Sequence, residues 1–251
     1  MIADLVRKNR SYRRFYQEIP IECETLKELV GLTCYCASAA NLQPLKYILS
    51  CDPEKNALIF KHLAWAAYLK DWEGPPEGER PSAYIIVLGD TTIAKSFGCD
   101  HGIASQTILL GATEKGLGGC MMGSVKRKEF RQALSIPGHL EILLVIALGK
   151  PKERVVIETV GPDGNIKYWR DSQDVHHVPT FILSQIRPVY FWPMPLRCGL
   201  DRGASPIHSS QLSAVLGQSQ DRPDNSWHSG RVGPQESCYL RGFLVRRNGL
   251  R

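Results

Sequence analysis

The sequence lacks several features that would assign it to common classes. It contains no apolar run of the roughly 18 residues needed to cross a bilayer. Residues 1–15 lack the apolar segment and small-residue cleavage site of a secretory signal. Eight cysteines are present, but none has C-x-x-C spacing. We therefore expect a cytoplasmic protein with no membrane partner and no metal ion, whose cysteines are free, mostly buried thiols.

Two phosphate-binding fingerprints are also missing. There is no G-x-x-x-x-G-K-[ST] sequence, which excludes a P-loop. Segment 116–119 is rich in glycine, but a predicted helix precedes it and a predicted strand follows. This order is the reverse of the strand–turn–helix order that a dinucleotide fingerprint requires. The segment is therefore not a Rossmann-type nucleotide site.

Lysine is absent from the last 72 residues, and this absence divides the chain. Residues 1–179 hold 22 Lys and Arg against 21 Asp and Glu, whereas residues 180–251 hold nine Arg and four acidic residues. Six prolines, seven glycines and nine serines interrupt any regular period there. We expect 180–251 to be a basic C-terminal extension of low order. A shifted reading frame or a fused gene fragment is a hypothesis for its origin.

Within residues 1–179, hydrophobic patterns predict interleaved helices and strands. Helices are expected at 2–8, 22–36, 53–68 and 126–134, and a long one runs from Asp100 to the glycine turn. Strands are expected at 45–51, 83–89, 140–149, 155–157 and 166–169, with a short one after the glycine turn. Several links are too short to contain crossover helices. We therefore expect a mixed sheet with helices on both faces.

Three side-chain patterns admit local interpretations. On the helix that begins at Asp100, Ile103 and Thr107 are expected to share one face, with further apolar residues widening it. Trp65, Tyr68 and Trp72 form a helical stripe, for which core packing is favoured over a lid above a cofactor. The adjacent histidines 176 and 177 are expected in a loop rather than at a metal site.

Three polar segments lie at 10–13, 38–44 and 116–120, with predicted buried strands between them. In this order they resemble the nitroreductase family of flavin mononucleotide (FMN) oxidoreductases over residues 2–179. The motifs that carry the resemblance are Arg10-Ser11-x-Arg13, Ser38-Ala39-x-Asn41-x-Gln43-Pro44, Asp100-x-Gly102-Ile103-Ala104-x-Gln106, Gly116-Leu117-Gly118 and the strand end at 147–151.

The resemblance implies an α+β fold with three α/β/α layers, in which helices flank a mixed, mainly antiparallel sheet. It also implies a homodimer with FMN at the interface. The implied activity is ping-pong hydride transfer from NAD(P)H to a nitroaromatic, a quinone or a similar small-molecule acceptor. Because the flavin carries the reaction, no catalytic side chain is required.

The resemblance also implies residue roles at the phosphate. Arg10, Ser11 and Arg13 would contact the flavin phosphate and the nearby flavin edge, since guanidinium forks and a hydroxyl suit a phosphate. Relatives carry basic residues directly after a Val-Pro pair that corresponds to Val178-Pro179, but Thr180 follows here. Lys150 or Lys152 would then substitute for the missing phosphate contacts.

The other implied contacts concern the ring and its sugar-like chain. Ser38 and Asn41, in the turn that also holds Gln43, would hydrogen-bond the ribityl chain or the pyrimidine edge. The backbone of the glycine turn would pass beside the flavin N5, where side chains would obstruct hydride transfer. The turn residues with this role are Leu117, Gly118 and Gly119.

Two alternatives remain open at this point. One keeps the flavin fold but changes the chemistry to dehalogenation, flavin fragmentation or azoline oxidation. The other is a non-enzymatic nucleic-acid-binding or scaffold protein that uses the basic extension and the Arg10 loop. The extension contains no recognised nucleic-acid module and its charge is modest, so we do not expect a nucleic-acid partner.

Overall fold

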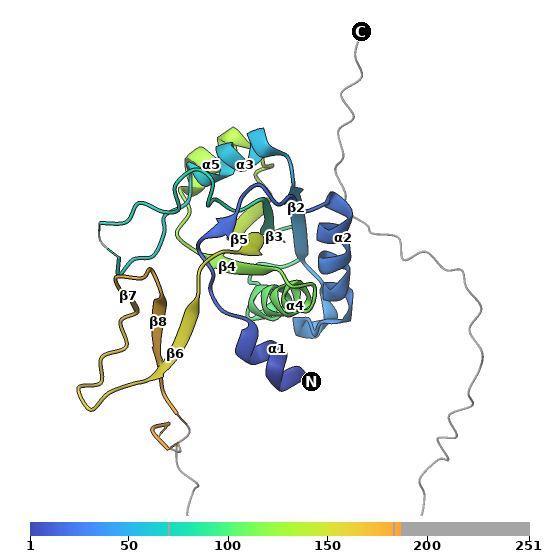
Figure 1. Ribbon diagram of the computed structural model, residues 1–251. Helices are drawn as coiled ribbons and strands as arrows, with labels where there is room; N and C mark the ends of the chain where they lie inside the picture. The colour runs from blue at the N-terminus through green and yellow to red at the C-terminus, as the bar shows by residue number, and fades with distance from the viewer. Residues whose placement is uncertain (70, 183, 187–251) are drawn as a thin grey trace, which may run out of the picture. The chain divides into compact units, whose positions relative to one another are not determined.

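Helices cover both faces of a central antiparallel sheet (Figure 1). The computed structural model describes residues 1–69, 71–182 and 184–186. Its helices are α1 (Ile2–Lys8), α2 (Cys23–Gly31), α3 (Pro53–Phe60), α4 (Asp100–Glu114) and α5 (Arg127–Ala133), with 3-10 turns η1 (Leu32–Tyr35) and η2 (Ala39–Asn41). Its strands are β1 (Phe15–Tyr16), β2 (Leu45–Ser50), β3 (Ala83–Asp90), β4 (Gly118–Met122), β5 (Leu140–Pro151), β6 (Val155–Thr159), β7 (Trp169–Arg170) and β8 (His176–Thr180).

The longest strand, β5, organises the main sheet. It pairs antiparallel with β1, β3 and β4, and β3 pairs antiparallel with β2. All eight residues of β3 are buried. A strand covered on both faces needs apolar side chains at successive positions, which explains the continuous runs that predict β3 and β5. The three-layer, mainly antiparallel α+β fold is confirmed.

Alternate side chains of the sheet enter two cores. Tyr84, Ile86 and Val145 point to the face that also buries Ile59 of α3 and Phe130 of α5. Their neighbours along β3 and β5 point to the opposite face and pack against α2 and α4. The register between β3 and β5 shifts after Val87. Beyond this bulge, Leu88, Leu140 and Ile142 belong to the same core as Tyr84.

The buried face of α4 differs from the expected one. Ala104, Ile108 and Ala112 are buried, whereas Ile103 is 40% exposed and the face that it shares with Thr107 points outward. The small residues face inward because α4 lies close to its neighbours: a Cβ on Gly111 would stand 2.5 Å from the side chain of Leu32. An outward apolar face is thus left on this helix.

A second, three-stranded sheet follows β5. Strand β8 pairs in parallel with β6 and antiparallel with β7. The expectation that His176 and His177 lie in a loop is therefore wrong. The expected strand at 166–169 is also displaced, since β7 contains only Trp169–Arg170. β8 forms by pairing with β6, about 20 residues earlier, and β7 forms by pairing with β8.

Helix α3 ends at Phe60, so the prediction that Trp65, Tyr68 and Trp72 lie along one side of a helix is also wrong. Trp65 is buried in the core, as expected. Trp72 packs against the same core, as expected, and also lies 4.2 Å below the Arg170 guanidinium. The Tyr68 ring lies 4.9 Å from that of Tyr168, near the second sheet. The segment after α3 thus reaches to the second sheet (Figure 1).

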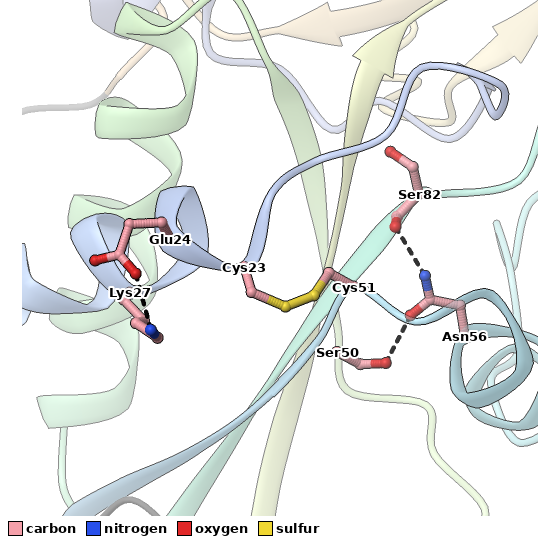
Figure 2. Close-up of a disulfide and its surroundings, with 7 residues drawn as sticks. All are labelled: Cys23, Glu24, Lys27, Ser50, Cys51, Asn56 and Ser82. Atoms are coloured by element: carbon pink, nitrogen blue, oxygen red, sulfur yellow. Dashed lines mark hydrogen bonds and ion pairs between the residues drawn. A yellow bond between two sulfur atoms is a disulfide. The ribbon is translucent and has the colours of Figure 1, made fainter. Parts of the chain in front are cut away.

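A disulfide joins Cys23 to Cys51, so the expectation of free thiols is wrong for these two cysteines. It connects the start of α2 to the end of β2, next to a buried bridge in which Asn56 bonds Ser50 and the carbonyl of Ser82 (Figure 2). The two residues are 28 positions apart, so no local spacing signalled the bond. Cys120 is a buried free thiol, as expected, but Cys34 and Cys99 are exposed, so the expectation of mostly buried thiols is wrong for the described cysteines.

The described chain continues slightly beyond residue 179. Thr180 ends β8, and the side chain of Gln185 donates to the carbonyl of Val160. Residues up to Gln185 belong to one compact unit. The expected low-order extension otherwise lies outside the described residues. Every helix in the described part is too short or too polar to span a bilayer.

Candidate functional site

The basic loop after α1 lies beside the glycine turn. Ser11 forms a parallel bridge with Gly119, and the backbone N–H of Tyr12 donates to the Gly119 carbonyl at 3.0 Å. The Lys150 ammonium donates to the carbonyl of Gly116 at 3.2 Å. The first and third polar segments, together with Lys150, therefore form one group, which we call the basic half-site. Its expected ligand-binding residues are Arg10, Ser11, Arg13, Leu117, Gly118, Gly119 and Lys150.

Close packing within the chain already accounts for two of the three glycines of this turn, Gly118 and Gly119. A Cβ on Gly118 would stand 2.5 Å from the ring of Tyr12. A Cβ on Gly119 would stand 2.5 Å from the carbonyl oxygen of Ala147. The flat group that approaches Gly118 is thus a side chain of the same molecule. Tyr12 had no such role in the sequence analysis.

Both guanidinium groups of the basic half-site lack a carboxylate partner among the described residues. Arg10 donates from Nη2 to the carbonyl of Val6, and its Nε is buried without a partner. Arg13 donates from Nη1 to the carbonyl of Ser11 at 3.1 Å and contacts Nε2 of His176 at 3.2 Å. Positive groups with N–H donors to spare suit an anion such as a phosphate.

Behind Arg13 lies a buried ionic group that the sequence analysis missed. The Glu153 side chain is fully buried; one oxygen accepts from the backbone N–H of Arg13 and the other from Arg170 at 3.0 Å. His176 is fully buried beside them. Burial, and then the nearby Arg13 and Arg170, lower the pKa of His176 to about 4. In the sequence, Glu153 stands between Lys152 and Arg154, and nothing in that pattern indicates that its side chain is buried.

The second polar segment forms a separate group at the start of α4. Asp100 accepts from the Ser38 hydroxyl at 2.6 Å and from the backbone N–H of Ala39 at 3.1 Å. The side chain of Gln43 donates to the Asn41 side chain at 3.0 Å. We call this group, Ser38–Gln43 with Asp100, the polar half-site; its expected ligand-binding residues are Ser38, Asn41 and Gln43.

The turn of the polar half-site has a strained backbone. Ala40, Asn41 and Gln43 have φ values of 50°, 53° and 51°, which is the left-handed region. Asparagine tolerates this conformation, but alanine and glutamine adopt it at a cost of about 1–2 kcal/mol each. Strain of this kind concentrates at functional turns, so it adds weight to this segment as a site.

One chain does not bring the two half-sites together. The polar half-site lies at the start of α4, and Leu117 follows its end. A helix of 15 residues is about 22 Å long. The sheet agrees: Leu45, just after the polar half-site, pairs with Gly89 at one end of β3, whereas Gly118 pairs with Gly149 near the other end. A slot formed by all three segments therefore does not exist within a single chain.

Exposed apolar side chains surround the polar half-site. Tyr35 is 91% exposed, Leu42 47% and Ile103 40%. A shallow depression over the outward face of α4 includes Ile103 and Thr107. The described residues contain no cluster of three His, Cys, Asp or Glu side chains that could hold a metal ion.

Comparison with known proteins gives a consistent result. The model for the nitroreductase family matches residues 79–150, which contain β3, α4, β4 and most of β5. A provisionally named NADH dehydrogenase/NAD(P)H nitroreductase of Methanothermobacter thermautotrophicus is 30% identical over 159 residues. The match covers 61% of this chain and 78% of that protein.

Solved structures show the same fold. A nitroreductase family protein from Streptococcus pneumoniae TIGR4 has a TM-score of 0.54 at 17% identity, covering 65% of this chain and 96% of the other. An FMN-dependent nitroreductase from Clostridium difficile R20291 has a TM-score of 0.50 at 22% identity, covering 61% and 89%.

Proposed function

The chain belongs to the nitroreductase family, and from this premise we propose that it is an FMN-dependent oxidoreductase. One structural neighbour is an FMN-dependent enzyme, and one relative is named for NAD(P)H. When bound, the flavin supplies hydride transfer from NAD(P)H to a small acceptor such as a nitroaromatic or a quinone. The chain's own residues bind and orient it.

One observation carries this proposal: two guanidinium groups of the basic half-site have no carboxylate partner in the part of the chain that the structure describes. A buried Nε of Arg10 without a partner is costly unless a ligand satisfies it. The remaining N–H groups of Arg13, the hydroxyl of Ser11 and the ammonium of Lys150 complete a donor set suited to a phosphate dianion. The residues present therefore fit FMN better than a ligand without phosphate.

We further propose that two copies of the chain form the complete site. A twofold axis would bring the polar half-site of one subunit to the basic half-site of its partner, which a single chain cannot do. The exposed side chains of Tyr35, Leu42 and Ile103 lie where such a partner would pack. Ser38, Asn41 and Gln43 would then bind the ribityl chain or the pyrimidine edge from the other subunit.

A flavin spectrum of the purified full-length chain tests the cofactor. The protein should be yellow, or turn yellow with added FMN, and NAD(P)H should bleach it under anaerobic conditions. Arg10→Gln should weaken FMN binding about tenfold or more, because a charged hydrogen bond is lost. Lys61→Gln removes a charge from an exposed residue after α3 and serves as the matched control. A protein that stays colourless in excess FMN would overturn the proposal.

Ultracentrifugation tests the dimer. Ile103→Asp and Tyr35→Asp should each yield monomers that lose FMN affinity together with dimerisation. Ile93→Asp changes an equally exposed isoleucine outside α4 and should do neither. A wild-type monomer that binds FMN tightly would contradict the shared site.

A further inference from the structure

Arg13 is held by neutral acceptors alone, although a carboxylate lies next to it. One oxygen of Glu153 accepts from the backbone N–H of Arg13 and the other from the Arg170 guanidinium. The Arg13 guanidinium instead contacts the Ser11 carbonyl, the His176 ring nitrogen and the face of Tyr168, 4.9 Å from the ring centroid. Its positive charge is therefore not neutralised among the described residues.

The contact fixes the protonation state of His176. Because the Arg13 N–H can only donate, Nε2 of His176 must accept, and the imidazole proton must lie on Nδ1. That Nδ1 is buried, with no hydrogen-bond partner within residues 1–69, 71–182 and 184–186. The positive groups that face the ring, Arg13 and Arg170, together with burial, oppose a second proton.

A purely structural role does not explain this arrangement. A buried donor without a partner destabilises a fold, and an apolar ring of similar size would pack against Tyr168 without that cost. What the imidazole provides is an uncharged acceptor for Arg13. A carboxylate there would pair with Arg13 and compete with an incoming anion.

We propose that His176 is a positioning residue: as a neutral acceptor it holds the Arg13 guanidinium so that its other N–H groups face the FMN phosphate. This inference rests on the proposed function. Glu153 assists by fixing the backbone of Arg13 while leaving its side-chain charge available. His176 and Glu153 therefore orient Arg13 without neutralising the charge of its guanidinium.

Two substitutions separate positioning from packing. His176→Phe keeps a ring but removes the acceptor, so FMN affinity should fall about tenfold. The thermal midpoint of the apoprotein should hold or rise, since an unpartnered buried donor disappears. His176→Gln restores an oxygen near the position of Nε2 and should bring FMN affinity back to within about threefold of wild type. His177→Phe, on the neighbouring residue that contacts Asp171 and Glu158, is the control and should leave FMN affinity unchanged.

A double-mutant cycle tests whether His176 affects FMN affinity through Arg13. In an Arg13→Gln background, His176→Phe should cause no further loss of FMN affinity, because the residue it positions is gone. Additive losses, or a His176→Phe variant that binds FMN as wild type does, would overturn the inference. If His176→Phe does not fold, His176→Leu with the same cycle decides in its place. A wild-type chain that binds no FMN would instead refute the proposed function itself.

Discussion

The carbonyl oxygen of Ala147 lies 2.5 Å from the point where a Cβ on Gly119 would stand. Both atoms belong to paired strands, so neither backbone can move without breaking the ladder between β4 and β5. Gly119→Ala should therefore lower the free energy of unfolding by about 2–3 kcal/mol. Urea unfolding followed by circular dichroism measures this change.

Gly123→Ala is the matched control for this prediction. It lies just after β4, and a Cβ there would have no atom within 4 Å. We expect it to change the free energy of unfolding by less than about 0.5 kcal/mol. Equal effects of the two variants would show that close packing is not why position 119 is glycine.

The sequence predicts the elements that depend on local pattern. The buried strands β3 and β5 follow from continuous apolar runs. Helix α4 lies where a helix was predicted, although its buried face is not the predicted one. The three polar segments are also found in the right order. Their order does not show which of these segments lie together in the folded chain. The distance between the polar and basic half-sites depends on the length of α4 and on the direction of β2.

Elements that depend on distant partners were predicted poorly. Strand β8 contains Pro179 and two histidines and has little intrinsic strand character, so its pairing with β6 decides its structure. Trp72 has helical spacing from Trp65, yet it lies outside any helix and contacts Arg170, about 100 residues away in the sequence. The Cys23–Cys51 disulfide likewise joins segments whose proximity exists only in the folded chain.

Asp100 should be the anchor of the polar half-site. Asp100→Ala removes the acceptor for the Ser38 hydroxyl and the Ala39 N–H, and we expect a loss of about 2 kcal/mol in stability. Hydrogen exchange should quicken at the amides of Ala39 and Gln43. The amide of Leu117, which bonds Ala112 beyond the other end of α4, should keep its protection.

Glu114→Ala is the control for Asp100→Ala. It removes an exposed carboxylate at the far end of the same helix and should change stability by less than about 0.5 kcal/mol. Uniform loss of protection over both ends of α4 in Asp100→Ala would mean that the polar half-site is not an independent local unit.

The Cys23–Cys51 disulfide should contribute substantially to stability. It closes a loop between positions 28 apart, for which the chain-entropy model gives roughly 3–4 kcal/mol. A Cys23→Ser/Cys51→Ser double variant should lose about that free energy, and a thiol reductant should lower the thermal midpoint of wild type but not of the variant.

Cys99→Ser supplies the comparison, because Cys99 is an exposed free thiol and should respond to reductant as wild type does. Alkylation of the unreduced, unfolded chain followed by mass spectrometry checks the bond directly. Labelling of both Cys23 and Cys51 before reduction would show that the disulfide is absent.

His176 and His177 should titrate in opposite directions. The hydrogen bond with Asp171, and then that with Glu158, raise the pKa of His177 above 6.5, whereas burial lowers that of His176 to about 4. His177 therefore adds stability below pH 6.5 that is lost as pH rises through its folded-state pKa. His176 acts on the acid side: between pH 6.5 and pH 4 the unfolded chain binds a proton that the native state does not, so stability falls as pH falls.

Nuclear magnetic resonance of the two imidazoles resolves these effects residue by residue. His177→Gln should flatten the loss of stability on the alkaline side, and His176→Gln should flatten the loss on the acid side. The two side chains lie on opposite sides of β8, so each variant should shift the other histidine's pKa only slightly, through the loss of one neighbouring charge. Two coincident titrations near pH 6.5 would mean that neither the Asp171 contact nor the buried place beside Arg13 exists in solution.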